Sequence, residues 1–209
     1  MRTVQGALAS GREQTRDAGR EAARRFVEHA DRAGLVDVAY SVLDSPIGPL
    51  VGATTERGVV ALSFGTESLD AVLQEVSAGV SPRVLEVPSR LDPIRRQLDE
   101  YFEGRRRRFE LSVDLRLVRG FRRKVLDATA RIPYGMVASY REVATRAGNP
   151  GASRAAGTAL ALNPVPIIVP CHRVLRTGGN LGGYGGGLER KRFLLDLEAS
   201  GRDGETSPV

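Results

Sequence analysis

The chain holds one cysteine, Cys171, and a histidine follows it directly. Pro166 and Pro170 flank the apolar run that leads to this pair, and their rings stiffen its backbone. A thiol is largely protonated at neutral pH, so a nucleophilic cysteine needs a base or a positive charge nearby. His172 could take the proton, directly or through a water, and a carboxylate would then orient the imidazole. Spacing alone identifies no single carboxylate, and a lone cysteine is also typical of a small buried core residue.

A glycine-rich stretch from Gly178 to Gly187 follows the cysteine and histidine. Glycines let the backbone approach a ligand closely, although such stretches also form flexible surface loops. Metal chemistry is not expected. One cysteine forbids an internal disulfide and a cysteine-rich zinc site, and the two histidines, His29 and His172, lie far apart in the sequence.

The charge balance favours a polyanionic partner. The net charge is +6 and the sequence pI is near 10.1, and cations that bind phosphates release counterions. GC-rich coding would explain why only Lys124 and Lys191 are lysines, but not why the sum is positive. No apolar run approaches the ~20 residues of a membrane span, and the arginine-rich N-terminus lacks the apolar stretch of a signal peptide. We therefore expect a soluble cytoplasmic protein without a membrane partner.

The first half of the chain predicts a small α+β domain behind a charged extension. Residues 1–36 are expected to form a solvated helix or a loose tail. Residues 37–117 carry the domain, whose sheet is predicted to be largely antiparallel. Its strands are expected at 38–43, 50–55, 59–65, 83–87 and 107–114, and its helices at 68–78 and 91–104.

The second half predicts a mostly helical domain over residues 118–199, followed by a polar tail at 200–209. Ser139 and Glu142 have the spacing of a capping box at the start of a short helix. A glycine-containing turn leads to a second short helix, which is helix-turn-helix geometry. Small side chains on that second helix would let it approach another helix or a DNA groove. Helices are expected at 121–130, 140–147, 153–162 and 188–199. Nine basic residues between 105 and 124 favour DNA, unless they form a solvated face.

Three segments carry a resemblance to a known family: "PYGMVASYREVA", "NPVPIIVPCHRV" and "GGYGGGL". Over about residues 37–198 the chain resembles the O6-alkylguanine-DNA alkyltransferases, also called methylated-DNA–protein-cysteine methyltransferases. The resemblance implies DNA repair by direct reversal, in which Cys171 irreversibly accepts the alkyl group of O6-alkylguanine in double-stranded DNA. Each molecule would act once. No cofactor is expected, because the electrophile arrives on the DNA.

The resemblance also assigns roles to other residues. The helix-turn-helix would dock in the minor groove, and the damaged nucleotide would be flipped out of the duplex. His172 would take the thiol proton through a water, and Glu198 would be the carboxylate that spacing does not identify. Tyr140 would help to rotate the nucleotide and protonate the guanine ring. Asn163 would tie the recognition helix to the active-site segment.

The same resemblance implies a base-binding set. Arg154 would fill the space that the flipped base leaves, and the carbonyls of Cys171 and Val174 would read the exocyclic amine. Tyr184 and the backbone of Gly185 would close the pocket near O6. The full expected DNA- and base-binding set is Arg154, Tyr184, Val174, Gly185, Ser153 and Ala152.

The sequence departs from the family pattern in places. Leu126 stands where a tryptophan is common, Gly185 replaces a frequent serine, and the zinc ligands of some members are missing. A monomer is expected, with cooperative binding along DNA left open. Two alternatives compete. One is a non-catalytic lesion-binding protein, although such relatives lack the acceptor cysteine. The other is a cysteine hydrolase, which would need turnover and an oxyanion hole.

Overall fold

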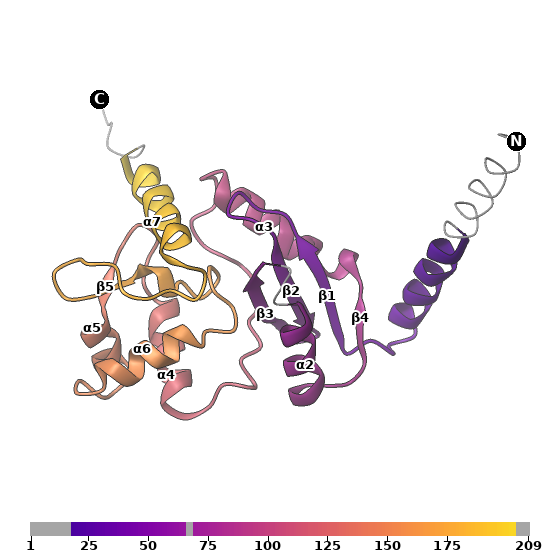
Figure 1. Ribbon diagram of the computed structural model, residues 1–209, viewed down its shortest axis with the longest axis horizontal. Helices are drawn as coiled ribbons and strands as arrows, with labels where there is room; N and C mark the ends of the chain where they lie inside the picture. Colours follow the sequence, from indigo (N-terminus) through magenta and orange to yellow (C-terminus); the bar gives the residue numbers. More distant parts are fainter. Residues whose placement is uncertain (1–17, 66–68, 204–209) are drawn as a thin grey trace, which may run out of the picture.

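A computed structural model describes residues 18–65 and 69–203. Figure 1 shows two halves side by side: a sheet with helices on its faces, and a group of helices and irregular segments formed by the C-terminal half. The predicted α+β fold class is confirmed. One hydrophobic core runs through both halves, from Ala39 in the sheet to Leu194 in the last helix. The predicted domain boundary near residue 117 therefore stays a prediction.

The sheet has four strands in the order β3-β2-β1-β4. The strands β1 (Val38–Leu43), β2 (Leu50–Thr55) and β3 (Gly58–Phe64) form an antiparallel meander, with a register shift between Ala53 and Thr54. Short apolar runs separated by turn residues produce this arrangement. The prediction of a largely antiparallel sheet is confirmed, but the short strand β4 (Val84–Glu86) pairs with β1 in parallel.

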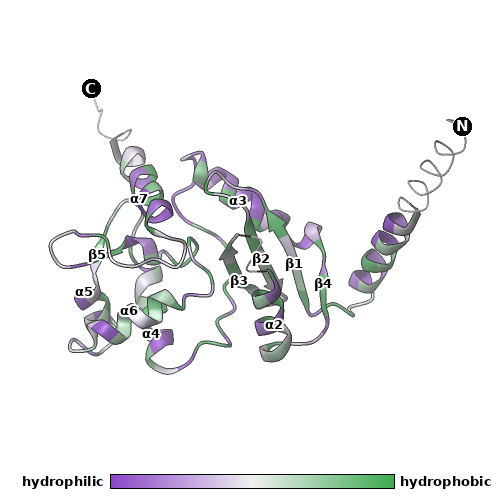
Figure 2. Ribbon diagram, viewed as in Figure 1, coloured by the Kyte–Doolittle hydropathy of each residue, from purple (hydrophilic) through white to green (hydrophobic). Residues whose placement is uncertain are grey.

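Both faces of the sheet are covered. Helix α2 (Leu69–Gly79) packs Val72 and Val76 against one face, where they meet Val38 and Val51. The short helix η2 (Pro88–Leu91) and helix α3 (Asp92–Phe102) cover the other face and contribute to the main core. Successive side chains of a strand point to opposite faces, so each strand supplies both cores. Figure 2 shows apolar colouring along the strands between these helices.

The strand predicted at residues 107–114 does not form. This segment touches the sheet at a single bridge, between Val59 and Val113. The backbone N–H of Glu110 bonds to the side chain of Gln97 on α3 instead of to a neighbouring strand. The last two of four consecutive arginines, residues 105–108, begin this segment, and Arg106 just before it pairs with Glu100 on α3. The pairing of Arg106 with α3 holds the start of this segment beside the helix. The β-forming residues that follow pair with β3 at one position and do not form a strand.

The predicted helix-turn-helix is present. Helix α4 (Gly120–Ala130) packs against it, and α5 (Tyr140–Arg146) and α6 (Ser153–Ala161) are its two helices. The capping box is confirmed in both directions: the Ser139 hydroxyl accepts from the Glu142 N–H, and the Glu142 carboxylate accepts from the Ser139 N–H. Gly148 has φ +88° in the turn, a conformation that favours glycine.

The remaining segments wrap around this helical group (Figure 1). A single turn of 3-10 helix, η3 (Cys171–Arg173), leads into the short strand β6 (Val174–Leu175), which pairs in parallel with β5 (Ala138–Ser139). The last helix, α7 (Leu188–Asp203), is longer than predicted. The polar tail expected from residue 200 is therefore helical as far as residue 203.

Residues 18–32 form a helix that projects from the sheet half (Figure 1). Ala30 is buried, and Asp31 pairs with Arg90 at 2.5 Å, so the base of this helix is attached to the body. The helical alternative is confirmed for this part, and the rest of the predicted extension lies outside the described residues. Within the described ranges, no helix has the length and apolar character needed to cross a membrane.

Candidate active site

Cys171 lies at the floor of an open pocket. Its side chain is 7% exposed and lines a cavity of about 230 Å³. The Asn163 side-chain amide donates to the Cys171 Sγ at 3.1 Å and to the Val169 carbonyl at 2.8 Å. The expected tie between the end of the recognition helix and the cysteine segment is thus seen as two hydrogen bonds. Strand β3 also contributes to the pocket, which is lined by Leu62, Ser63, Phe64, Leu160, Ala161, Asn163, Pro166, Cys171, Tyr184 and Gly185.

The backbone before the cysteine is strained. Ile167 is fully buried and has φ +72°, a left-handed conformation that β-branched residues rarely adopt. Such a residue costs about 1–3 kcal/mol and persists only where its surroundings fix it. The surroundings here are the two flanking prolines and the hydrogen bond from the Val169 N–H to the Val165 carbonyl at 2.9 Å. The strained residue lies four positions before Cys171. The contacts that hold it also fix the path of the backbone that leads to the cysteine.

His172 and Glu198 form a buried pair. The His172 Nε2 lies 2.9 Å from the Glu198 Oε1, and the two side chains are 0% and 1% exposed. An ionised carboxylate only accepts hydrogen bonds, so Nε2 must carry the proton and Nδ1 the lone pair. The Nδ1 atom is buried and makes no hydrogen bond within the described chain. His172 therefore keeps one nitrogen available as a base.

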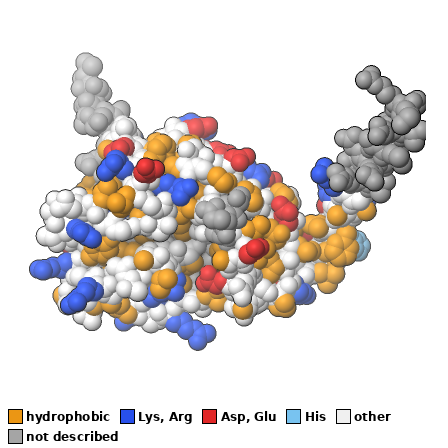
Figure 3. Space-filling view, in the orientation of Figure 1, with side chains coloured by type: hydrophobic (Ala, Val, Ile, Leu, Met, Phe, Trp, Pro, Cys, Tyr) orange, Lys and Arg blue, Asp and Glu red, His pale blue; other side chains and the backbone are white. Residues whose placement is uncertain are grey.

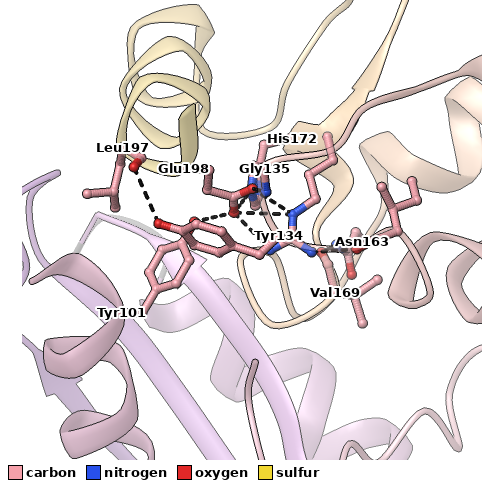
Figure 4. Close-up of polar contacts among 10 residues, drawn as sticks. Tyr101, Tyr134, Gly135, Asn163, Val169, His172, Leu197 and Glu198 are labelled. Atoms are coloured by element: carbon pink, nitrogen blue, oxygen red, sulfur yellow. Dashed lines mark hydrogen bonds and ion pairs between the residues drawn. The ribbon is translucent and has the colours of Figure 1, made fainter. Parts of the chain in front are cut away.

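Glu198 is also the centre of a wider network (Figure 4). Arg173 donates to both of its oxygens, at 2.8 Å to Oε1 and 2.9 Å to Oε2. The Gly135 N–H donates to Oε2 at 2.9 Å, and the Tyr101 hydroxyl donates to Oε1 at 2.7 Å. Burial alone would raise the pKa of Glu198, but the hydrogen bonds from His172 and Arg173 lower it to about 2. The carboxylate is therefore ionised at neutral pH.

The resting thiol is protonated. Burial raises the pKa of Cys171 to about 11, against the opposing effects of the Asn163 hydrogen bond and the Lys191 charge. Burial also lowers the pKa of His172, so its imidazole is neutral and able to accept a proton. The site thus holds a neutral thiol beside a neutral base. Removing the thiol proton has to accompany the reaction rather than precede it.

The pocket opens into a groove over the helix-turn-helix. A second cavity of about 520 Å³ shares Ala161, Tyr184 and Gly185 with the cysteine pocket. The recognition helix and the loops around it supply the other walls. These are formed by Tyr140, Ser153, Arg154, Gly157, Arg176 and Gly183. Arg154 is exposed at its edge. Figure 3 shows arginine and lysine side chains at the end of the molecule formed by these helices.

The Tyr140 side chain passes close to two glycines. A Cβ atom on Gly157 would be 3.6 Å from its ring, and one on Gly182 would overlap the phenol oxygen. One glycine of the recognition helix and one of the glycine-rich loop therefore make room for this ring. Burial raises the pKa of Tyr140 above its ordinary value, so the phenol keeps its proton at neutral pH.

Tyr184 stands between the pocket and the groove. Its ring meets the His172 ring edge-on at 6.5 Å and packs on Phe64 at 5.5 Å. Its hydroxyl is buried without a hydrogen-bond partner in the described chain. Burial raises the pKa of Tyr184 well above its ordinary value, so the hydroxyl is a neutral donor. A Cβ on the neighbouring Gly185 would have an ordinary contact of 3.7 Å with Ala161, so the missing serine side chain is not excluded by space.

Other expected residues lie near the same place. The Val174 carbonyl accepts from the buried Lys191 ammonium at 2.7 Å and keeps a second lone pair. Ala152 is the N-cap residue of α6, and Ser153 is its first helical residue. Seven of the predicted residues line the pocket or the groove: Tyr140, Ser153, Arg154, Asn163, Cys171, Tyr184 and Gly185. His172, Glu198, Val174 and Ala152 lie outside the two linings. Several arginines of the basic cluster at 105–124 are paired with acids, which reduces the charge they offer to a partner.

Sequence reasoning missed three members of the site. Arg173 is 6% exposed and donates to Glu198. Tyr101, from the other half of the chain, also donates to Glu198. Lys191 is buried and donates to the Val174 carbonyl. Arg173 follows the histidine directly, and Lys191 is one of two lysines, so these two had a weak signal. Nothing in the sequence around Tyr101 distinguishes it from a core tyrosine.

The fold and site together define a class: a helix-turn-helix protein with a cysteine at the floor of a pocket beside its DNA-facing groove. Comparisons with known proteins narrow this class. Residues 38–115 match the ribonuclease-like domain of 6-O-methylguanine DNA methyltransferase, and residues 120–200 match its DNA binding domain. The chain therefore belongs to the methylated-DNA–protein-cysteine methyltransferase family. Membership assigns to it DNA repair by transfer of an alkyl group to a protein cysteine.

Individual relatives agree over most of their length. A methylated-DNA–protein-cysteine methyltransferase of Mycobacterium bovis is 40% identical over 78% of this chain and 93% of that protein. One from Methanosarcina acetivorans is 38% identical over 77% and 98%. The structure of Mycobacterium tuberculosis OGT in complex with DNA is similar with a TM-score of 0.66 at 39% identity, covering 78% of this chain and 94% of that one.

Proposed function

We propose that Cys171 is the alkyl acceptor and that it removes the alkyl group from O6 of guanine in double-stranded DNA. One observation carries this assignment: the only sulfur nucleophile of the chain faces a pocket that opens onto the groove of the helix-turn-helix. In one in-line displacement the Sγ–carbon bond forms and the carbon–O6 bond breaks. The bonding electrons leave with the guanine, and the product is an S-alkylcysteine.

His172 and Tyr140 balance the protons of this step. The His172 Nδ1 takes the thiol proton through a water, and the Glu198 carboxylate stabilises the imidazolium that forms. Tyr140 lies in the groove with a neutral phenol and donates a proton to the guanine ring as O6 gains charge. The leaving guanine is therefore neutral. The thiol proton passes, in net terms, to the base.

The groove explains how a base inside a duplex reaches the sulfur. The nucleotide is flipped through the opening between Tyr184 and Ala161 into the pocket, and Arg154 enters the base stack in its place. Docking in the minor groove fits the small residues at the start of α6, Ala152 and Ser153, which let the helix come close to the DNA.

The base is held by groups at the pocket wall. The buried, unpartnered hydroxyl of Tyr184 and the Gly185 backbone face the O6 position. The carbonyls of Cys171 and Val174 accept from the exocyclic amine with their remaining lone pairs. We further propose that the protein works as a monomer in the cytoplasm, and that each molecule acts once.

A methyl-transfer assay tests the assignment. The chain is mixed with a duplex that contains O6-methylguanine, and its tryptic peptides are measured by mass spectrometry. The proposal expects the mass of one methylene on the peptide that contains Cys171 and none on Cys171→Ser. Continued turnover would favour the cysteine hydrolase, and binding of the damaged duplex without transfer would favour the lesion-binding protein.

A further inference from the structure

Tyr101 connects the sheet half of the chain to the catalytic carboxylate. It lies on α3, is fully buried, and donates its hydroxyl to the Glu198 Oε1 at 2.7 Å. The same oxygen accepts from the His172 Nε2 at 2.9 Å. Figure 4 shows the two donors reaching Glu198 from opposite sides, one from the N-terminal half and one from the cysteine segment.

The choice of partner is informative because a buried phenol does not need a carboxylate. Tyr134 lies next to Tyr101, with their rings 6.1 Å apart and edge-on, and it bonds to a backbone carbonyl, that of Leu197, at 3.3 Å. This bond satisfies its hydroxyl at no cost to the site. Tyr101 instead adds a donor to a carboxylate that Arg173 and Gly135 already hold.

An added donor changes what the carboxylate does to the histidine. Each hydrogen bond to the charged form stabilises the negative charge on Glu198 and leaves less of it to act on the imidazole. A neutral imidazole is the form that can accept the thiol proton. Burial and the Glu198 charge both raise the pKa of Tyr101, so its hydroxyl is a donor throughout the working pH range.

We propose that Tyr101 is a positioning residue for alkyl transfer: its hydroxyl fixes the Glu198 carboxylate and moderates the pull of that charge on the His172 proton. This inference rests on the proposed roles of Cys171 and His172. It gives the sheet half a direct part in the chemistry, although that half contributes no residue to the Cys-His-Glu set.

The other groups around His172 would be unchanged when this hydroxyl is removed. The titratable and charged groups that face it come from η3, α7 and the glycine-rich loop, and they are Cys171, Arg173, Lys191, Glu198 and Tyr184. Tyr101→Phe therefore isolates one donor. The expected result is a more basic His172, because Oε1 then acts on the imidazole with more of its charge.

Two readouts test the proposal on the full chain. The first is the single-turnover rate constant on a methylated duplex as a function of pH. In Tyr101→Phe its acid limb is expected to move up by about 0.5–1 pH unit, which lowers the rate about three- to tenfold on that limb. Tyr134→Phe is the matched control, because it removes a neighbouring phenol hydroxyl that bonds to a backbone carbonyl rather than to Glu198, and it should leave the limb in place.

The second readout does not depend on transfer. The chain has two histidines, His29 and His172, and His29 is exposed on the N-terminal helix, far along the sequence from the site. In an NMR titration of isotope-labelled histidine, Tyr101→Phe should move the His172 midpoint upward, and a His29→Gln background assigns the signal to His172. Should this variant not fold, 3-fluorotyrosine at position 101 keeps the packing and strengthens the donor, which should move the midpoint downward.

The outcomes separate the two levels of the argument. If the unmodified chain transfers methyl groups but neither readout moves in Tyr101→Phe or the fluorotyrosine protein, Tyr101 is merely structural and the inference is overturned. If the histidine midpoint moves as expected but the unmodified chain transfers nothing, the proposed function fails while the coupling between Tyr101 and His172 stands.

Discussion

The two halves of the molecule organise their residues in different ways. The sheet half consists of regular elements whose apolar side chains fill two cores, and its polar residues are mostly at the surface. The C-terminal half carries its chemistry partly on helices and partly on the irregular backbone between them, which runs from Asn163 through a single helical turn at the cysteine to the glycine-rich loop. The sheet half therefore mainly supports the site, whereas the irregular segments of the C-terminal half bring the cysteine and its pocket close to residues on the helices. Glu198, which both halves contact, joins the two.

The largest effect is expected where the halves meet. Glu198→Gln removes the charge that faces His172 and leaves the Arg173 guanidinium buried without a counter-ion. We expect the transfer rate to fall by about 10²-fold or more and the free energy of unfolding by about 3–5 kcal/mol. Stopped reactions on a methylated duplex and denaturant unfolding measure the two. Glu189→Gln, an exposed acid on the same helix, is the control. A variant that lost activity at full stability would show that the halves are not coupled through this residue.

Next in size is an effect confined to the C-terminal half. Arg154→Ala should slow repair of a duplex about 10²-fold, because the flipped nucleotide loses the side chain that replaces it. Reaction with free O6-benzylguanine needs no flipping and should change less than about twofold. Arg192→Ala on α7 is the matched control, since it removes an exposed arginine away from the groove. Equal losses on both substrates would remove Arg154 from this role.

A smaller effect concerns stability in acid. The pKa of Glu198 is about 2 in the folded protein and near its ordinary value in the unfolded chain. A depressed folded pKa stabilises the protein above the unfolded value, and this contribution is lost as the pH falls toward the folded value. We expect a loss of about 2–3 kcal/mol between about pH 5 and pH 2 from this group. Denaturant unfolding at several pH values measures it. The stability difference between the unmodified chain and Glu198→Gln should shrink over this range, and parallel curves would contradict the assignment.

The smallest effect compares two adjacent glycines. A methyl group on Gly182 would overlap the Tyr140 phenol, whereas one on Gly183 would meet nothing within 4 Å. Gly182→Ala should displace the ring and slow transfer to duplex DNA about tenfold, and Gly183→Ala should leave the rate unchanged. Measured transfer rates for the pair, with free O6-benzylguanine as well as duplex DNA because Gly183 also lines the groove, decide the point. Equal rates would mean that the position of Tyr140 does not depend on the loop.

The comparison also shows what the sequence could and could not reveal. The meander from Val38 to Phe64 follows apolar runs and turn residues, so its strands were predicted within one residue. The segment at 107–114 also alternates apolar and polar residues, yet its Glu110 N–H bonds to the Gln97 side chain and the segment stays off the sheet. Local composition predicts a strand's propensity but not its pairing.

The site shows the same limit. The cysteine and its histidine are adjacent and could be found by type and spacing, whereas Glu198 required the family resemblance. Tyr101 lies 97 residues from its partner, and no periodicity connects them. The left-handed Ile167 is also unexpected, because a β-branched residue is among the least suited to that conformation. A contact between residues far apart in the sequence, and a backbone conformation imposed by packing, both depend on the folded structure. Neither can be predicted from the local sequence.

The most direct test of the account is the stoichiometry and site of transfer. The full chain is incubated with an excess of duplex that carries O6-methylguanine, and the repaired DNA and the modified peptide are counted together over time. The account predicts a burst that ends at one repaired guanine per protein molecule, with the methyl group on Cys171. Repair that continues past one equivalent, or a methyl group on any other residue, would contradict it.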